Sequence, residues 1–358
     1  FVSMPEVAHV LGKGKTKAMI KLKNGLDVDL RVVPEESFGA ALNYFTGSKD
    51  HNVALRRIAQ EKGLKLNEYG LFRGSQRIAG KTEEEIYKVL GLSFIPPEIR
   101  EDQGEIEAAK KGEIPDLVGY QDLRGDLQIQ TTWTDGANSI EEMAEEARRL
   151  GLEYIAITDH TKGLAMTGGS DEKKLLRQMA TIEKINRSLK GITVLKGAEV
   201  NINKDGSLDI KDEVLAELDV VGIAVHSHFN LPRREMTERI KRAMRNPHAD
   251  ILFHPTGRVI QKREPYDVDM DEIIRTAKET GTVLEVDAYP NRLDLKDEHV
   301  RKAIEAGVKL VIDSDAHSVN HMRFLEFGVA QARRGWARKN DILNTLPEKD
   351  FIRSLKRP

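Results

Sequence analysis

Six apolar runs in the chain each end in histidine, aspartate or glutamate, the residue types whose spacing points to chemistry. The residues at these ends are Asp159 with His160, then Glu199, His226, His254, Asp287, and the group Asp313, Asp315 and His317. Imidazole nitrogens and carboxylate oxygens are ligands of divalent cations. A lone buried histidine is more often a hydrogen-bonded core residue. Four histidines at separate strand ends instead predict a metal site.

The elements that must position these residues are strands and helices in alternation. The strand-like runs begin at Tyr154, Val194, Val220, Ile251, Val283 and Leu310, and an opening run at 125–130 makes seven. Helical patterns fall at 140–150, 171–189, 236–246, 270–280, 297–306 and 320–338, and Ser139 with Glu142 forms a capping box. This alternation predicts an α/β domain at 123–358, a distorted seven-stranded (β/α) barrel with polar strand ends gathered on one face.

Composition narrows the class of protein. The 358 residues are enough for two domains, and 39% hydrophobic with 32% charged residues is typical of a globular chain. Cysteine is absent, which excludes disulfides and thiolate zinc ligands. No apolar run is long enough for a membrane span, so we expect a cytoplasmic protein without a membrane partner. The chain opens at Phe1 rather than at methionine, which indicates a fragment or a processed product.

The N-terminal part is basic and strand-rich. Residues 1–79 carry 13 Lys+Arg against 8 Asp+Glu, and 80–120 carry 5 against 10. The excess of positive charge suits a polyanion, although charge alone favours the simpler interpretation of a solvated face. Asn24-Gly25 between two alternating runs predicts a hairpin. Asp27 and Asp29 share one strand face. They either hold a cation or form the solvent-exposed face of a half-buried sheet.

The stretch that follows carries a specific set of motifs. Two predicted helices flank Tyr44-Phe45-Thr46-Gly47-Ser48. Asn52 and Arg56 lie in the first part of the second helix. With Asp29, this stretch resembles the palm and thumb of family X DNA polymerases. The resemblance implies that Asp29 is a catalytic carboxylate for Mg²⁺. It also implies that the deoxynucleotide and DNA are contacted by Tyr44, Phe45, Gly47, Ser48, Asn52 and Arg56.

Part of the polymerase site is missing from this chain. The family's Gly-Ser pair and Asp-x-Asp do not occur in residues 1–28, so one catalytic carboxylate of three remains. Polymerase activity, with a deoxynucleoside triphosphate as substrate, is therefore expected only in an intact protein. We expect a partial palm at 1–33, a thumb at 34–92, a Pro/Gly-punctuated linker at 93–122 and the barrel from 123 onward; the N-terminal part is of the α+β class.

The strand ends of the barrel resemble a second known domain. In order, 156–160, 197–200, 225–228, 254–258 and 313–317 match motifs of the polymerase-and-histidinol-phosphatase (PHP) domain. The resemblance implies a Mn²⁺ or Zn²⁺ site with the ligands Asp135, His160, Glu199, His226, His254, Asp315 and His317. Gln128 and Gln130 stand where the family has two histidines, which damages one of three metal positions. One metal would use Glu199, His226 and His254, and another Asp135, His160 and His317.

The resemblance implies hydrolysis of a DNA phosphodiester at a 3′ end, as a 3′→5′ exonuclease acting in repair on gapped or 3′-ended DNA. Glu199 would bridge two cations, Asp315 would take part, and Arg258 or His228 would meet the phosphate. Asp159 is expected to orient the His160 region, and Asp294 to be structural. The alternative is a DNA-binding scaffold with a vestigial site, and phosphate monoesters are a third class of substrate.

Overall fold

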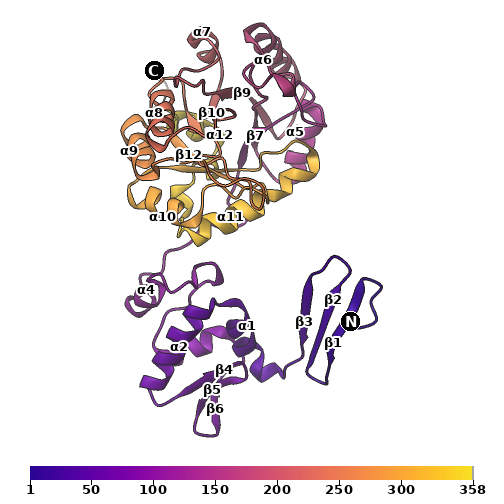
Figure 1. Ribbon diagram of the computed structural model, residues 1–358, viewed down its shortest axis with the longest axis vertical. Coiled ribbons are helices and arrows are strands. Elements are labelled where there is room, and N and C mark those ends of the chain that lie inside the picture. The colour runs from indigo at the N-terminus through magenta and orange to yellow at the C-terminus, as the bar shows by residue number, and fades with distance from the viewer. Residues whose placement is uncertain (357–358) are drawn as a thin grey trace. The chain divides into compact units, whose positions relative to one another are not determined.

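The computed structural model describes residues 1–356, apart from the side chain of Ala165. The chain divides into two compact units, Phe1–Ile114 and Pro115–Pro358, each of which folds around its own core (Figure 1). Among the described helices, none has the length and apolar character needed to cross a membrane.

The first unit begins with an antiparallel sheet of three strands, β1 (Val7–Lys13), β2 (Lys17–Leu22) and β3 (Asp27–Arg31). The predicted hairpin is confirmed, since β2 pairs with β3 across Asn24-Gly25. Gly25 has φ +90°, which favours glycine, and the Asn24 side chain accepts a hydrogen bond from the Leu26 amide at 3.1 Å. Of the sheet residues, Ile20 is fully buried.

Helices and a second small sheet follow. They are α1 (Phe38–Thr46), α2 (Lys49–Glu61), β4 (Lys65–Asn67), β5 (Gly70–Arg73), β6 (Gln76–Ala79) and α3 (Glu83–Leu90). The two predicted helices are confirmed, but Tyr44 and Phe45 lie in the last turn of α1 rather than in a loop. Helix α1 ends at Gly47, which has an extended backbone. The Ser48 side chain then caps α2 by accepting a hydrogen bond from the His51 amide.

The segment 93–122 differs from the linker expected there. It contains α4 (Glu105–Lys111) and a buried arginine, Arg100, which pairs with Glu83 at 2.7 Å and donates to the Ile95 carbonyl. Glu105 is buried against His51, with 2.6 Å between Oε1 and Nδ1. Ile95, Ile99 and Ala109 of this segment are also buried, so residues 93–114 fold with the first unit, and the second unit begins at Pro115.

The second unit is built on seven parallel strands that follow one another in chain order. They are β7 (Gly125–Ile129), β8 (Tyr154–Ile157), β9 (Thr193–Asn201), β10 (Val220–Ala224), β11 (Ile251–Leu252), β12 (Val283–Asp287) and β13 (Leu310–Asp313). The two edge strands meet through the bridge between Ile129 and Ala316, whose amide donates to the Gln128 carbonyl at 3.1 Å. The predicted barrel is confirmed and is nearly closed.

Helices cover the outside of this barrel (Figure 1). They are α5 (Ile140–Arg149), α6 (Glu172–Asn186), α7 (Asp212–Leu215), α8 (Arg233–Met244), α9 (Met270–Thr280), α10 (Asp297–Glu305) and α11 (Leu325–Arg334). A further helix, α12 (Glu348–Ser354), packs instead against the inner residues of the strands through Phe351. The capping box of Ser139 and Glu142 is present. The expected helix at 320–338 is shorter, because a 3₁₀ stretch occupies Val319–Phe324 and α11 ends before Gly335.

Two apolar cores support the strands. The larger lies between strands and helices and includes Ile129, Val286 and Met143. The smaller includes Phe253 and Tyr154, and Tyr154 stacks on Phe351 of α12 with 5.4 Å between ring centroids. The strands are thus fixed along their length, which leaves the loops after their carboxyl ends to carry polar side chains.

Candidate metal centre at the strand ends

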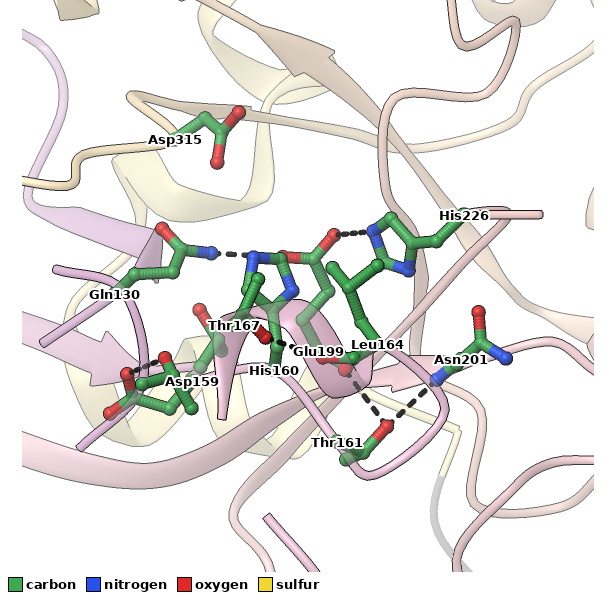
Figure 2. A network of polar contacts seen from close by, with 12 residues as sticks. Gln130, Asp159, His160, Thr161, Leu164, Thr167, Glu199, Asn201, His226 and Asp315 are labelled. Atoms are coloured by element: carbon green, nitrogen blue, oxygen red, sulfur yellow. Dashed lines mark hydrogen bonds and ion pairs between the residues drawn. The ribbon is translucent and has the colours of Figure 1, made fainter. Parts of the chain in front are cut away.

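The centre is organised around Glu199, a fully buried carboxylate near the end of β9. Its Oε1 lies 2.8 Å from Nε2 of His226 and 2.8 Å from Nε2 of His254. Its Oε2 lies 3.3 Å from Nδ1 of His160. Three imidazoles from the ends of different strands therefore converge on one carboxylate, and Figure 2 shows His160 and His226 on either side of it.

A second group adjoins the first through His160. Oδ2 of Asp135 lies 3.6 Å from Nε2 of His160 and 3.7 Å from Nε2 of His317. The side chains of Asp135, His160 and His317 each offer one ligand atom within 4.8 Å of the others, and so do those of His160, Glu199 and His226. Two overlapping sets of potential metal ligands thus share one histidine.

The turn that carries Asp135 is held by Asp159. Its carboxylate accepts from the amide and the hydroxyl of Thr131, from the Thr134 hydroxyl and from the Gln178 side chain, all within 2.8 Å. Asp159 therefore fixes the turn after β7, beside the position of His160. Gly136 closes the same turn, where a Cβ would lie 2.3 Å from the Gln130 carbonyl oxygen.

Electrostatics favour an ionised Glu199. Burial alone would raise its pKa, but the charges of His160 and His226 and the hydrogen bonds from His226 and His254 lower it well below the ordinary value. Burial, assisted by the charge of Arg292, lowers the pKa of His254. A carboxylate that stays charged beside neutral imidazole is the protonation state in which both groups can bind a cation.

Gln128 and Gln130 are buried at the same end of the barrel. Nε2 of Gln130 donates to Oε2 of Glu199 at 2.9 Å, an amide contact that Figure 2 shows directly. Within the part of the chain that the structure describes, both amide atoms of Gln128 and the carbonyl oxygen of Gln130 have no hydrogen-bond partner. Both amides therefore line the centre. Gln130, however, points its NH₂ group, which cannot bind a cation, toward the Glu199 carboxylate.

Asp315 lies apart from His160 and His226 (Figure 2). Its Oδ2 is 3.3 Å from Nε of Arg292, which is also 3.3 Å from Oδ2 of Asp287. Its Oδ1 is 3.8 Å from Nδ1 of His317. Neither set of potential ligands found in the described residues includes Asp315. A guanidinium thus neutralises the side of the centre where Asp315 was expected to bind a metal.

Arg258 is engaged elsewhere. Its guanidinium donates to the backbone carbonyls of Arg292 and Leu293, so it fixes the loop that presents Arg292. Asp294 accepts from the amide and hydroxyl of Thr256, both at 2.9 Å, which is the structural role expected. His228 is exposed and lines a pocket of about 970 Å³.

The expected polymerase residues lie in the first unit. Asp29 is 47% exposed and pairs with Lys17 at 3.4 Å, and no set of potential metal ligands in the described residues contains it. Nδ2 of Asn52 donates to the Tyr44 carbonyl at 2.8 Å, and Nε of Arg56 donates to the Asn52 carbonyl at 3.2 Å.

The rings of Tyr44 and Phe45 meet edge to face, with 5.0 Å between centroids. A Cβ on Gly47 would lie 3.2 Å from Oδ1 of Asn52. These contacts, with the Ser48 cap on α2, make the end of α1 and the start of α2 one structural element.

Several buried polar groups escaped the sequence reasoning. They are Arg292 and two fully buried carboxylates, Glu285 on β12 and Asp126 on β7. Burial, with Asp287 and Asp313 close by, raises the pKa of Glu285 well above its usual value. Asp126 could have been found from the two-residue periodicity of a strand, because it lies on the same face as Gln128 and Gln130. No periodicity in the sequence indicates that Arg292 pairs with Asp315.

Comparison with known proteins adds independent findings. Residues 41–101 match the family DNA polymerase beta thumb, and residues 126–288 match the PHP domain family. The chain is 41% identical over 360 aligned residues to the DNA polymerase/3'-5' exonuclease PolX of Bacillus subtilis, covering 99% of this chain and 63% of that protein. It is 32% identical to a probable phosphatase of Acetivibrio thermocellus over 188 residues, 50% of this chain and 73% of the relative.

Among solved structures, a zinc, L-histidinol and phosphate complex of histidinol phosphate phosphatase from Lactococcus lactis is 16% identical. It covers 58% of this chain and 93% of that one, with a TM-score of 0.44.

Proposed function

The chain belongs to the family X DNA polymerases that carry a PHP domain, and we propose that its barrel hydrolyses the terminal phosphodiester at a DNA 3′ end. The observation that carries this proposal is the convergence of His160, His226 and His254 on both oxygens of buried Glu199. Beside it, Asp135 and His317 complete a second set that shares His160. Two adjoining ligand sets suit a two-metal phosphoesterase.

The donor set fits divalent cations. Nε2 of His226 and Nε2 of His254 both lie 2.8 Å from Oε1 of Glu199, so these three atoms can serve one cation as ligands. One cation would be held by Glu199, His226 and His254, and the other by Asp135, His160 and His317. With nitrogen and oxygen ligands and amides at the rim, Mn²⁺ is our proposed metal, and Zn²⁺ is the competitor.

The chain's own residues supply orientation and charge. Bound cations would activate a water and offset negative charge at phosphorus. Gln130 donates to Glu199 and so fixes which face of the carboxylate points to each histidine. Arg292 keeps Asp315 and Asp287 neutralised, which leaves less negative charge to repel a phosphodiester. His228, exposed beside His226, is the group we propose to donate a hydrogen bond to the phosphate. We assign Arg258 to positioning the Arg292 loop.

The first unit is proposed to hold DNA. Its residues 1–79 carry 13 Lys+Arg against 8 Asp+Glu, and Tyr44, Phe45, Gly47, Ser48, Asn52 and Arg56 lie at the junction of α1 and α2. The chain spans 63% of the length of the Bacillus relative. In a longer protein with the remaining palm carboxylates, Asp29 would join them to bind Mg²⁺ and a deoxynucleoside triphosphate. We accordingly propose a partial palm at 1–33, a thumb from 34 and a PHP domain at 123–358.

One observation favours a second candidate, a DNA-binding scaffold with a retired site. The amide of Gln130 donates a hydrogen bond to Glu199. Neither Gln128 nor Gln130 offers the imidazole that the family has at these two positions. If the missing position is essential for turnover, DNA would be retained but not cleaved.

The test is the shortening of a 5′-labelled oligonucleotide with Mn²⁺, by the wild-type chain and by His226→Ala. Loss of at least about 100-fold in rate is expected for the variant, because a metal ligand is removed. His248→Ala, a histidine outside the centre, is the matched control. Equal cleavage by wild type and His226→Ala refutes the proposal, and DNA retention without cleavage by the wild type supports the scaffold.

A further inference from the structure

We propose that the pocket of about 970 Å³ beside the metal centre binds the 3′-terminal nucleobase of the DNA, which stacks on the flat face of Arg263. This inference rests on the proposed hydrolysis and names the part of the substrate that the pocket recognises. The pocket is lined by two loop segments, 228–232 after β10 and 263–267 after β11. Both loops start at proposed metal ligands, His226 and His254.

The floor of the pocket is a layered stack. Cζ of Arg263 lies 4.1 Å from the ring centroid of Phe229, and the Phe229 ring stacks on Tyr266 with 6.4 Å between centroids and 19° between planes. Nε and Nη2 of Arg263 both donate to the Gly257 carbonyl, at 3.0 and 2.8 Å. The guanidinium is therefore pinned with one face on an aromatic ring, an arrangement that leaves the opposite face for a planar ligand.

The stack is tied rigidly to the metal centre. The Tyr266 hydroxyl donates to the carbonyl of Pro255 at 2.6 Å, and Pro255 follows His254 directly. Gly257 has φ +60°, and a Cβ there would lie 2.5 Å from the Tyr266 ring, so only glycine lets the ring pack against this turn. Phe229 follows His226 by three residues. A base seated on Arg263 would therefore be held at a fixed position relative to the cations.

The chemistry of the lining suits a nucleobase better than a phosphate. Bases stack on aromatic rings and on guanidinium planes in single-stranded nucleic acid recognition. Around the stack, Asn230, Glu264 and Asp267 offer donors and acceptors for the base edge. Two of these are carboxylates, which would repel a second phosphate but not an uncharged ring.

The experiment compares binding of two single-stranded oligonucleotides, one with a 3′-terminal thymidine and one with a 3′-terminal abasic residue, in EDTA so that no hydrolysis occurs. The wild-type chain is expected to bind the first about tenfold more tightly, since stacking of one base contributes on that order. Arg263→Lys keeps the charge but removes the plane, and it should abolish the preference. Arg353→Lys, on a 78% exposed arginine of α12, is the matched control and should keep it.

A second readout needs no variant. 2-Aminopurine at the 3′ terminus should lose fluorescence on binding, whereas 2-aminopurine placed in the middle of the strand should not. Equal affinity for the two ends with no selective quenching overturns the inference, even if Mn²⁺-dependent cleavage is observed. Cleavage that fails while the base preference persists would count against the proposed hydrolysis alone.

Discussion

Replacement of Arg292 by glutamine should destabilise the metal-free barrel strongly. Nε of Arg292 lies 3.3 Å from Oδ2 of Asp287 and 3.3 Å from Oδ2 of Asp315, and both carboxylates are buried. Removing one partner of a buried ion pair costs about 3–5 kcal/mol, because the remaining charge is left without compensation. The Arg292 side chain is 21% exposed, and burial already raises the pKa of Asp287 so that it can take up a proton. Both effects reduce the cost, so we expect the free energy of unfolding to fall by about 3 kcal/mol, the lower end of this range.

Urea unfolding in EDTA measures this change. Both tryptophans, Trp133 and Trp336, lie in the second unit, so fluorescence follows the barrel alone. Arg275→Gln is the matched control, since Arg275 is 61% exposed and pairs only at the surface with Glu272. It should change the free energy of unfolding by less than about 1 kcal/mol. A loss below about 1 kcal/mol for Arg292→Gln would refute the reading of Arg292 as the fixed counter-charge of this site.

Three further changes test other parts of the structure. Gly222→Ala should lower the free energy of unfolding by about 1–3 kcal/mol in the same urea assay, because a Cβ there would lie 1.9 Å from the Phe253 ring; an unchanged midpoint would show that the ring moves freely. Burial would raise the pKa of Glu105, but hydrogen bonds from His51 and from backbone amides lower it below 4.5, so its stabilising contribution is present above that pH and is lost as pH falls through the lowered pKa. Hydrogen exchange of α2 and α4 amides should therefore accelerate more steeply below about pH 4.5 in the wild type than in Glu105→Gln, and parallel profiles would contradict this. Restoring histidine at both Gln128 and Gln130 should add one Mn²⁺ per chain by elemental analysis, and no increase would show that Arg292 blocks the third position.

Much of the barrel could be predicted because its signals are local. Each strand is an apolar run that ends in a polar residue, and the parallel order follows from the helices between the strands. The same logic placed His160, Glu199 and His226 together, since residues at the carboxyl ends of parallel strands meet on one face. Helix ends were harder: Gly335 and the 3₁₀ stretch shortened the last expected helix.

Other features of the site could not be predicted from the sequence, because they depend on contacts between segments that are distant in the chain. Arg258 was assigned to the phosphate from its motif, but it is satisfied by the backbone of the Arg292 loop, 34 residues away. Asp315 matched a ligand position, yet a guanidinium from another loop reached it. The segment 93–122 resembled a linker from its prolines and glycines, whereas Arg100 and Glu105 bury their charges in pairs with Glu83 and His51. Pairing of buried charges leaves no periodic signal in a sequence.

The measurement that tests the account most directly is the number of Mn²⁺ ions bound per chain, determined by equilibrium dialysis and elemental analysis on wild type and Glu199→Gln. The account predicts two ions for the wild type and the loss of at least one in the variant, because Glu199 contacts His160, His226 and His254. A wild-type chain that binds no Mn²⁺, or a variant that binds as many ions as the wild type, would contradict the assignment of this cluster as a metal centre.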